Sequence, residues 1–405
     1  MTVYRIATTF QQLLTRGVEE IHVKEHLEKA LAGKKKLRVK HGIDPTGPLI
    51  HIGRAATQWK LREFQELGHQ LVIIIGDYTA QIGDPSDKLP KRPFLTKKDI
   101  DTNLKGYKQQ IGKIIDLDAV EWHYNSEWLA DLTPRELDEL AELFTVQQML
   151  ARRNFKDRFE KGEEISLREM HYPLYQGYDS VMIKADVEVG GSDQLFNMLA
   201  GRKIQEKMSQ APQDVLTTEM IDGLDGRKMS TSWGNVINIL DEANDMYGKV
   251  MSMTDEMMPK YAKLVARMGE QELKEWGLLA KKEPKKSKMW IARDVVNLYH
   301  GKSAGQKAEE EFENIHKQKG LPSDIPVLRY DADPSIIDVL VDSKLVSSRS
   351  EAARVLKENG VKAIFPDGKH AFEVSPLQPY NMIELSLGEV VIQKGKRGFV
   401  RVLKK

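Results

Sequence analysis

The stretch from Leu37 to Gly76 constrains the fold of this chain more than any other part of the sequence. Leu37 to Ile43 is a strand candidate, and His51 to Leu67 carries apolar residues at roughly helical spacing. Leu71 to Ile75 is apolar without alternation, which is typical of a parallel strand covered on both faces. Because parallel strands are joined by a crossover, usually a helix, the stretch predicts a βαβ unit with a right-handed connection.

The rest of the chain extends this pattern and then departs from it. Val120 to Tyr124 and Val181 to Val189 are further strand candidates, so strands alternating with helices predict an open α/β sheet. From about residue 241 to 316 the pattern is helical, and a segment rich in Gly and Pro near residues 320–334 indicates a linker. A compact tail follows, with a short helix predicted from Ser350 to Glu358 and β-like pieces after it.

Composition excludes several classes of protein. The chain has 405 residues and no cysteine, which excludes disulfides, thiolate metal sites and a cysteine nucleophile. Its longest apolar run, Leu71 to Gly76, is too short to span a bilayer, and the first residues lack an apolar signal core. We therefore expect a cytoplasmic protein with no membrane partner. The net charge of +1 seems to argue against a nucleic-acid partner, but an average can hide an asymmetry along the chain.

The first stretch that carries chemistry is Asp44-Pro45-Thr46-Gly47-Pro48-Leu49-Ile50-His51-Ile52-Gly53-Arg54. It lies between a predicted strand and a predicted helix that begins near His51. A helix start carries partial positive charge and free N–H groups, which suit a phosphate. Thr46 and His51 add side-chain donors, and Gly53 lets a ligand approach the backbone. Taken alone, an ordinary βα turn explains this stretch equally well.

The second stretch is Gly226-Arg227-Lys228-Met229-Ser230-Thr231-Ser232, a polar loop with one lysine and three hydroxyls. A lysine can neutralise the charge that builds on a triphosphate during displacement, and hydroxyls can donate to its oxygens. On composition alone, a solvated loop would be the better interpretation.

Together, the HIGH-like turn and the later KMSTS loop resemble the two signature motifs of class I aminoacyl-tRNA synthetases. Three more stretches narrow this resemblance to bacterial tyrosyl-tRNA synthetases: YTAQIGDPS at 78–86, YPLYQGYD at 172–179 and GGSDQ at 190–194. The resemblance covers nearly the whole chain, including the tail. It implies a Rossmann-like catalytic domain over 1–235 with an inserted dimerisation region near 125–165, an α-helical domain over 236–325, and a small α+β S4-like RNA-binding domain over 335–405.

The resemblance also implies roles for individual residues. Asp84, Tyr172 and Gln176 match the residues that hold the ammonium of the substrate tyrosine, and Asp179 matches the acid that bonds its hydroxyl. Gln194 matches a residue near the substrate carboxylate, and Asn125 matches a pocket asparagine. On the nucleotide side, Asp193 matches a ribose-binding acid, and Lys88 and Arg92 match basic residues of a loop that meets pyrophosphate.

The reaction that the resemblance implies has two steps. The tyrosine carboxylate attacks the α-phosphate of ATP to give tyrosyl-adenylate and pyrophosphate, and tRNA(Tyr) then takes the tyrosyl group. We expect the developing phosphate charge to be met by Thr46, His51, Lys228, Thr231 and Ser232, with Gly53 and Arg54 also at the ATP. Mg²⁺ is expected to accompany the ATP, held by phosphate oxygens and water rather than by protein ligands. The family is dimeric, so a homodimer is expected.

The chain departs from the family at two positions. Arg54 stands where the first motif usually has a histidine, so a phosphate contact is expected to replace a ribose contact. Lys40 stands where one bacterial subgroup has a tyrosine that bonds the substrate hydroxyl. The subgroup that this chain resembles more closely lacks that tyrosine. The second partner of the hydroxyl is therefore open at this stage.

The tail explains how a chain of near-zero net charge can bind RNA. Residues 335–405 contain 12 lysines and arginines against 8 aspartates and glutamates, a net charge of +4, which leaves −3 for the first 334 residues. The resemblance to an S4-type domain makes this basic face the expected tRNA-binding surface. Its candidate residues are Arg349, Arg354, Lys357, Lys394, Lys396 and Arg397.

Three other functions remain to be weighed. A tryptophanyl enzyme has a similar catalytic fold, but Asp179 with Gln176 and the S4-like tail count against it. Small-molecule adenylyltransferases share the first turn, yet they are much shorter and lack KMSTS. A synthetase-derived RNA-binding scaffold without catalysis is the non-enzymatic alternative, and intact Lys228, Asp193 and Asp179 argue against it.

Overall fold

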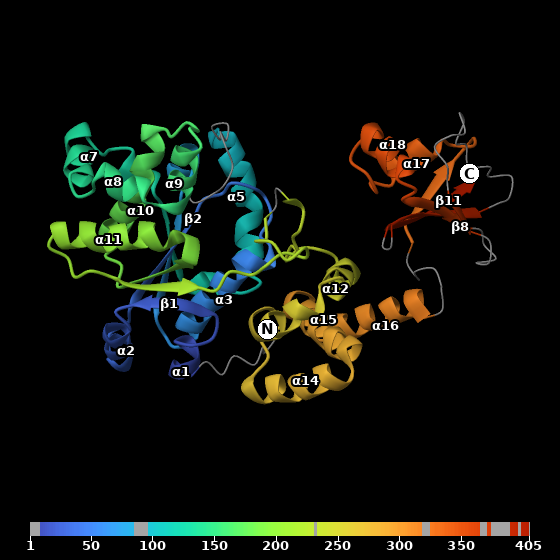
Figure 1. Ribbon diagram of the computed structural model, residues 1–405, viewed down its shortest axis with the longest axis horizontal. Helices are drawn as coiled ribbons and strands as arrows, with labels where there is room; N and C mark the ends of the chain where they lie inside the picture. Colours follow the sequence, from blue (N-terminus) through green and yellow to red (C-terminus); the bar gives the residue numbers. More distant parts are fainter. Residues whose placement is uncertain are drawn as a thin grey trace. The chain divides into compact units, whose positions relative to one another are not determined.

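The computed structural model describes residues 9–84, 96–230, 233–317, 325–364, 371–373, 389–395 and 398–404 (Figure 1). The chain divides into two compact units. The first comprises residues 1–241 and 252–291, and the second comprises 242–251 and 292–405. The expected division into three domains remains a prediction. None of the helices in the described residues combines the length and apolarity needed to cross a bilayer.

A six-stranded sheet forms the centre of the first unit, in the order β1-β6-β5-β2-β3-β4. Strand β1 is antiparallel to β6, and the other neighbours are parallel. The predicted βαβ unit is confirmed as β2, α3 and β3, and the strand predicted at 120–124 is β4. The strands are β1 (Val18–His22), β2 (Arg38–Ile43), β3 (Gln70–Ile75), β4 (Val120–Tyr124), β5 (Val187–Gly191) and β6 (Asp214–Thr218).

One predicted strand was placed too early. Residues 181 and 182 belong to helix α10 (Leu167–Met182), and β5 begins only at Val187. The apolar character of Val181 and Met182 comes from the helix end, because Val181 packs in the helical core beside Leu174 and Ile204. Lys184 then adopts a left-handed φ of 51°, which separates the helix from the strand. A short apolar run therefore did not distinguish the last turn of a helix from a strand.

Helices cover both faces of this sheet (Figure 1). Helix α3 (Ile52–Glu66) packs on β3, β5 and β6, whereas α10 packs on α11 (Leu195–Lys207), which itself contacts β5 and β6. The other helices of the first unit are α1 (Phe10–Leu13), α2 (Lys24–Ala32), α4 (Thr79–Ile82), α5 (Lys97–Ile111), η1 (Leu117–Ala119), α6 (Ser126–Leu129), α7 (Pro134–Ala141), α8 (Val146–Leu150), α9 (Arg153–Glu160), η2 (Ser192–Gln194), η4 (Asp255–Met257), α13 (Met258–Lys260), the π-helix η5 (Tyr261–Val265) and α14 (Glu270–Lys282).

The second unit contains helices and a separate five-stranded sheet. Helix α12 (Ala243–Met251) packs against α16 (Ala304–Lys317), where the rings of Tyr247 and Phe312 lie 5.3 Å apart. The boundary between the units falls within α15 (Pro284–His300). The helical pattern predicted for residues 241–316 is therefore confirmed.

The sheet of the second unit has the order β7-β11-β10-β8-β9. Apolar residues of α17 and α18, among them Ile336, Val339 and Leu356, pack with its strands in one core. Strand β7 lies in the segment predicted to be only a linker. The segment is a strand because it pairs in parallel with β11. The elements are β7 (Val327–Tyr330), α17 (Ile336–Asp342), α18 (Arg349–Lys357), β8 (Val361–Ile364), β9 (Ala371–Glu373), β10 (Glu389–Lys394) and β11 (Gly398–Lys404).

Candidate active site

The strand order of the first unit marks a ligand site at the carboxyl ends of β2 and β5. From β2 the chain proceeds through β3 to β4 on one side, whereas β5 and β6 lie on the other. In open α/β sheets, ligands bind where the strand order reverses in this way. The loops that leave β2 and β5 carry the HIGH-like turn and the GGSDQ stretch, respectively.

The two signature stretches lie side by side. The segment that follows the KMSTS loop pairs with the HIGH-like turn: the Ile52 N–H donates to the Ile237 carbonyl at 2.9 Å, and the Ile239 N–H donates to the Ile50 carbonyl at 3.0 Å. A Cβ added at Gly53 would lie 3.0 Å from Nδ1 of His51 and 3.4 Å from the Met229 sulfur. The small size of Gly53 therefore permits close packing where the two stretches meet.

His51 is a neutral donor at the start of helix α3. It is the N-cap residue, and its Nδ1 accepts the Arg54 N–H at 3.3 Å. Burial, together with the positive charges of Arg54 and Lys228, lowers the His51 pKa to about 3. Because Nδ1 accepts a hydrogen bond, the single proton of the neutral ring is on Nε2. His51 can therefore donate from Nε2 while the helix start adds its own partial positive charge.

Arg54 is held between two hydroxyl groups. Its guanidinium donates to the Tyr107 hydroxyl at 3.1 Å and to Oγ1 of Thr46 at 3.5 Å. Arg54 and Thr46 therefore lie beside each other, although they are eight residues apart in the sequence. Tyr107 comes from α5, and no motif indicated its involvement.

Lys228 and Asp193 form an ion pair of 2.8 Å, with side chains 42% and 34% exposed. This pair joins the KMSTS loop to the η2 turn after β5. Both groups are accessible to solvent, so the pair contributes little stability and can exchange its partners for those of a ligand.

Asp44 is a partly buried carboxylate that accepts two hydroxyl donors. The Tyr172 hydroxyl donates to Oδ2 and the Thr79 hydroxyl donates to Oδ1, each at 2.8 Å. Burial raises the Asp44 pKa to about 7, and these two hydrogen bonds oppose that rise. A Cβ at Gly76 would lie 1.9 Å from Asp44 Oδ1, so a glycine is required beside this carboxylate.

Asp179 is the second carboxylate of the site and is buried, with 4% of its surface exposed. Trp128 Nε1 donates to Oδ1 at 2.8 Å, and Asn125 Nδ2 lies 3.4 Å from Oδ2. Burial raises the Asp179 pKa to about 7, while the positive charge of Lys40 is the largest influence that opposes the rise. Near neutral pH, the carboxyl groups of Asp44 and Asp179 are therefore both close to the point at which they lose their protons.

A chain of hydrogen bonds joins the two carboxylates. Asn125 Nδ2 donates to the Thr79 hydroxyl at 3.0 Å, and Asn125 also contacts Asp179. The structure thus brings Tyr172, Asn125 and Asp179 together with Asp44 and Thr79. Sequence reasoning missed Asp44, Thr79 and Trp128 as site residues, although all three lie within or beside stretches that it singled out. The detectable signal was a carboxylate placed directly after a buried strand.

The remaining residues predicted to bind tyrosine form two further contacts. Gln194 Nε2 donates to Asp84 Oδ2 at 2.6 Å, and Asn197 Nδ2 donates to Oε1 of Gln194 at 3.0 Å. Gln176 Nε2 donates to Glu188 Oε1 at 3.1 Å. Gln176 and Asp179 lie three residues apart on α10, as expected for residues that share one helix face.

Several predicted site residues lie outside the described part of the chain, namely Lys88, Arg92, Thr231, Ser232, Lys396 and Arg397. Within the described part, no group of three or more His, Asp or Glu residues could hold a metal ion.

The predicted RNA-binding residues of the tail fall into two kinds. Arg349 pairs with Asp338, and Lys394 pairs with Glu351 at 3.4 Å. Arg354 and Lys357 lie in the last turn of α18, are exposed, and form no ion pair with the described residues. These two residues are therefore the most available cations of the predicted RNA-binding set.

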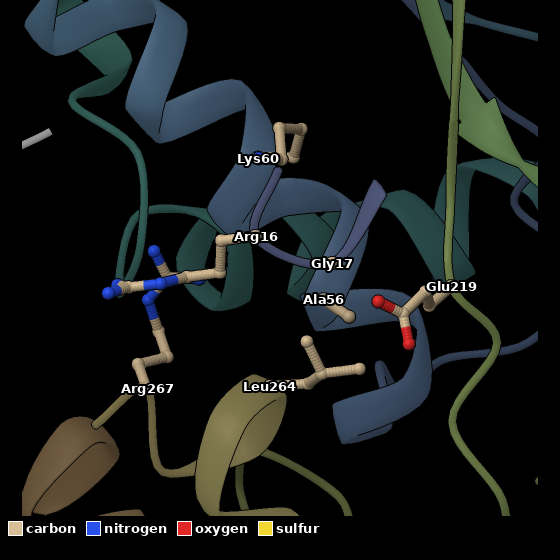
Figure 2. A pocket seen from close by; sticks show the side chains of 7 residues that line it. All are labelled: Arg16, Gly17, Ala56, Lys60, Glu219, Leu264 and Arg267. Atoms are coloured by element: carbon tan, nitrogen blue, oxygen red, sulfur yellow. The ribbon is translucent and has the colours of Figure 1, made fainter. Parts of the chain in front are cut away.

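A separate small pocket lies beside helix α3 and contains none of the predicted site residues (Figure 2). Figure 2 shows the side chains of Arg16 and Arg267 extending toward each other there, with Lys60 on α3 nearby. Lys60 and Glu63 form a buried ion pair of 2.6 Å at this place. The pocket is lined by Arg16, Gly17, Ala56, Lys60, Glu219, Leu264 and Arg267.

Residues 32–317 match the family model of class I tRNA synthetases (W and Y), and the chain belongs to this family. Its curated relatives include proteins named tyrosine–tRNA ligase. The one from Thermotoga maritima is 41% identical and covers 96% of each chain, and the one from Desulfotalea psychrophila is 41% identical and covers 97% of each. A third, from Moorella thermoacetica, is 43% identical over 96% of this chain and 95% of the relative.

Solved structures show the same fold at lower identity. A C-terminally truncated mitochondrial tyrosyl-tRNA synthetase from Aspergillus nidulans gives a TM-score of 0.63 at 20% identity, covering 75% of this chain and 93% of that one. The tyrosyl-tRNA synthetase of Archaeoglobus fulgidus, complexed with L-tyrosine, gives 0.60 at 23% identity, covering 74% and 98%. The expected Rossmann-like catalytic fold is therefore confirmed.

Proposed function

We propose that this chain attaches tyrosine to tRNA(Tyr) in two steps, through a tyrosyl-adenylate. The observation that carries the proposal is the chain of hydrogen bonds from Tyr172 through Asp44, Thr79 and Asn125 to Asp179, which is buried at its Asp179 end. It gathers residues from separate segments into one cluster with two carboxylates, beside the turn where the two signature stretches meet. Such a cluster suits a small ligand that carries both a cation and a hydroxyl group.

The amino-acid end of the site supplies groups for each polar part of tyrosine. We assign the ammonium to Asp84, Tyr172 and Gln176, the carboxylate to the region of Gln194, and the phenol hydroxyl to Asp179. Burial makes two ionised carboxylates costly near neutral pH, and an ammonium group removes part of that cost. Asn125, together with Trp128, fixes the orientation of Asp179.

The nucleotide end supplies donors to the phosphates of ATP. His51 donates from Nε2, Thr46 and Arg54 flank the same turn, and Lys228 meets charge that develops on the leaving group. Gly53 lets the nucleotide approach the backbone, and Asp193 is assigned to the ribose once Lys228 turns to the phosphates. Thr231, Ser232, Lys88 and Arg92 are assigned to the phosphates by family resemblance alone.

The chemistry balances without a covalent enzyme intermediate. An oxygen of the tyrosine carboxylate forms a bond to the α-phosphorus as the bond to the bridging oxygen breaks, so pyrophosphate leaves. A hydroxyl at the tRNA 3′ end then attacks the carbonyl carbon, and AMP leaves. A Mg²⁺ ion accompanying ATP would be held by phosphate oxygens and water rather than by the protein, and it would supply neutralisation of part of the triphosphate charge. The protein contributes position and fixed charge.

ATP–pyrophosphate exchange with three amino acids tests the proposal. We expect tyrosine to support exchange with a kcat/KM far above those of tryptophan and phenylalanine, since phenylalanine leaves the Asp179 acceptor without its partner. Exchange driven best by tryptophan would assign the other specificity of this family. No exchange with any of the three would support the non-catalytic scaffold.

We assign the tRNA to the tail, with Arg354 and Lys357 as the principal phosphate contacts and Arg349, Lys394, Lys396 and Arg397 around them. The support is a net charge of +4 on residues 335–405 and the exposure of the two α18 cations. An S4-like domain is the proposed identity of this sheet with its two helices. Since its substrates are tRNA and ATP, the reaction is placed in the cytoplasm.

A homodimer is proposed through the region near residues 125–165. Large apolar side chains are exposed there and at the start of α10, which supports an interface: Val146 is 59%, Phe159 is 64% and Leu167 is 76% exposed. Sedimentation of the purified chain tests this assignment, and a monomer at micromolar concentration would contradict it.

A further inference from the structure

Lys40 and Glu188 form a buried ion pair directly beneath the substrate-facing side of α10. They are register partners on the parallel strands β2 and β5, and their charged groups lie 2.9 Å apart. Lys40 is 0% and Glu188 is 2% exposed. A lysine at the centre of a parallel sheet is unusual, because a buried charge needs complete pairing to be tolerated.

All three N–H donors of Lys40 are already engaged. The ammonium donates to the Gln176 carbonyl and to the Ser180 hydroxyl at 2.7 Å each, and its third partner is Glu188. Lys40 therefore has no donor left for a substrate hydroxyl. The residue that replaces the tyrosine of the other subgroup does not take over the direct contact of that tyrosine.

Glu188 in turn orients Gln176. Its Oε1 accepts Nε2 of Gln176 at 3.1 Å, and its Oε2 accepts Nε2 of the buried Gln213. Since the amide nitrogen of Gln176 is directed at Glu188, the amide oxygen is left to accept a hydrogen bond from a cationic ligand. The pair thus contacts Gln176 at two points: Lys40 donates to its backbone carbonyl, and Glu188 accepts from its side-chain amide.

We propose that Lys40 and Glu188 are positioning residues that determine tyrosine specificity: they fix Gln176 and place one charge of each sign against the turn of α10 that carries Asp179. This inference rests on the proposed function. Lys40 places a positive charge near Asp179 and favours its ionised form, whereas Glu188 disfavours that form. The other titratable groups that act with Asp179 are Asp44 and Tyr172.

Opposite effects of two single substitutions provide the test. The readout is the ratio of kcat/KM for tyrosine to kcat/KM for phenylalanine in exchange, followed from pH 5.5 to 9. Phenylalanine has every group of tyrosine except the hydroxyl. Titration of Asp44 or His51 therefore affects both substrates alike and cancels in the ratio, whereas titration of Asp179 affects tyrosine alone. The acceptor works best when ionised, so the ratio falls as pH drops through the Asp179 pKa.

Lys40→Met removes the charge that favours ionisation, so the acid limb of this ratio moves to higher pH by about one pH unit. At pH 7 the ratio then falls by about fivefold. Glu188→Gln removes the opposing charge, so the limb moves to lower pH. In the double variant Lys40→Met/Glu188→Gln the limb returns toward that of the unmodified protein. A shift in the same direction for both single variants, or no shift in either, would overturn the proposal.

The design separates charge effects from general damage. Lys40→Met leaves a buried glutamate unpaired and can unfold the protein, in which case the direction of the Glu188→Gln shift decides. Lys60→Met and Glu63→Gln provide a matched control, because this buried pair lies on α3 beside the pocket of Figure 2. We expect the control variants to lower the melting temperature without moving the acid limb. If the unmodified protein supports no exchange with tyrosine, the proposed function fails rather than the role of the pair.

Discussion

The amino-acid end of the site and the basic face of the tail use charge in opposite ways. Asp44 is partly buried and Asp179 is fully buried, and each carboxylate is held by two polar donors. Arg354 and Lys357 are exposed cations without ion-pair partners among the described residues. Burial removes water from a charged side chain, so contact with a single substrate group can change the free energy of that side chain strongly. An exposed charge stays screened by water and salt, and its contribution to binding becomes large only when many such charges contact phosphates together.

With the site assignments proposed above, the difference explains how one chain recognises two very different substrates. A small amino acid offers few contacts, and these must be strong and well oriented. A tRNA offers many weak ones, so a solvated and salt-sensitive surface is sufficient. Lys228 is an intermediate case, because it is half-exposed in its pair with Asp193 and yet is assigned to the reacting phosphates.

The largest effect is expected from Lys228→Ala. A large effect would show that an exposed cation can contribute as strongly as a buried charge, which the comparison alone does not predict. The substitution should slow adenylate formation by about 100-fold or more, because charge that develops in the transition state loses its partner. Tyrosine affinity should stay the same, since the amino-acid end is untouched. Stopped-flow rates and equilibrium binding distinguish the two quantities. Lys35→Ala, which breaks the exposed pair with Asp186, is the control and should leave both unchanged. An unaltered rate in Lys228→Ala would remove this residue from the reaction.

Asp179→Asn tests the buried half of the comparison directly. We expect kcat/KM for tyrosine to fall by about 10- to 100-fold, the equivalent of a buried hydrogen bond to a charged group, with little change for phenylalanine. The loss should be the same at low and high salt, because water and ions do not reach the carboxylate. Asp214→Asn, at a buried carboxylate that bonds His26, is the control. Equal losses for both amino acids would show that Asp179 shapes the pocket without recognising the hydroxyl.

The double variant Arg354→Glu/Lys357→Glu tests the exposed half. Charging of tRNA should fall by about tenfold at low salt, and the difference should shrink as salt rises, because the contacts are screened. ATP–pyrophosphate exchange should be unaffected. Reversal of two exposed lysines of α14, Lys274→Glu/Lys281→Glu, provides a control with the same change in net charge. A loss of charging that does not depend on salt would mean that the tail does not bind phosphate electrostatically.

Much of the architecture was predictable because it depends on local pattern. The βαβ unit, the helix start at His51 and the strand at 120–124 all follow from hydrophobic spacing and turn residues. The strand predicted at 181–189 began too early, since Val181 packs as a helical residue in a core that only the folded chain creates. Strand β7 was missed because its pairing with β11, far along the chain, stabilises a segment whose prolines indicated a linker.

The sequence by itself determined the fold class, the family and the two stretches that would meet at the nucleotide. Only the tertiary structure decided which side chains share a hydrogen bond. It placed Asp44 between Tyr172 and Thr79, and it paired Lys40 with Glu188 beneath Gln176. The physical reason is that the pKa of a charged group and the contacts it can make depend on its burial and on partners distant in sequence. Spacing along the chain reports neither of these.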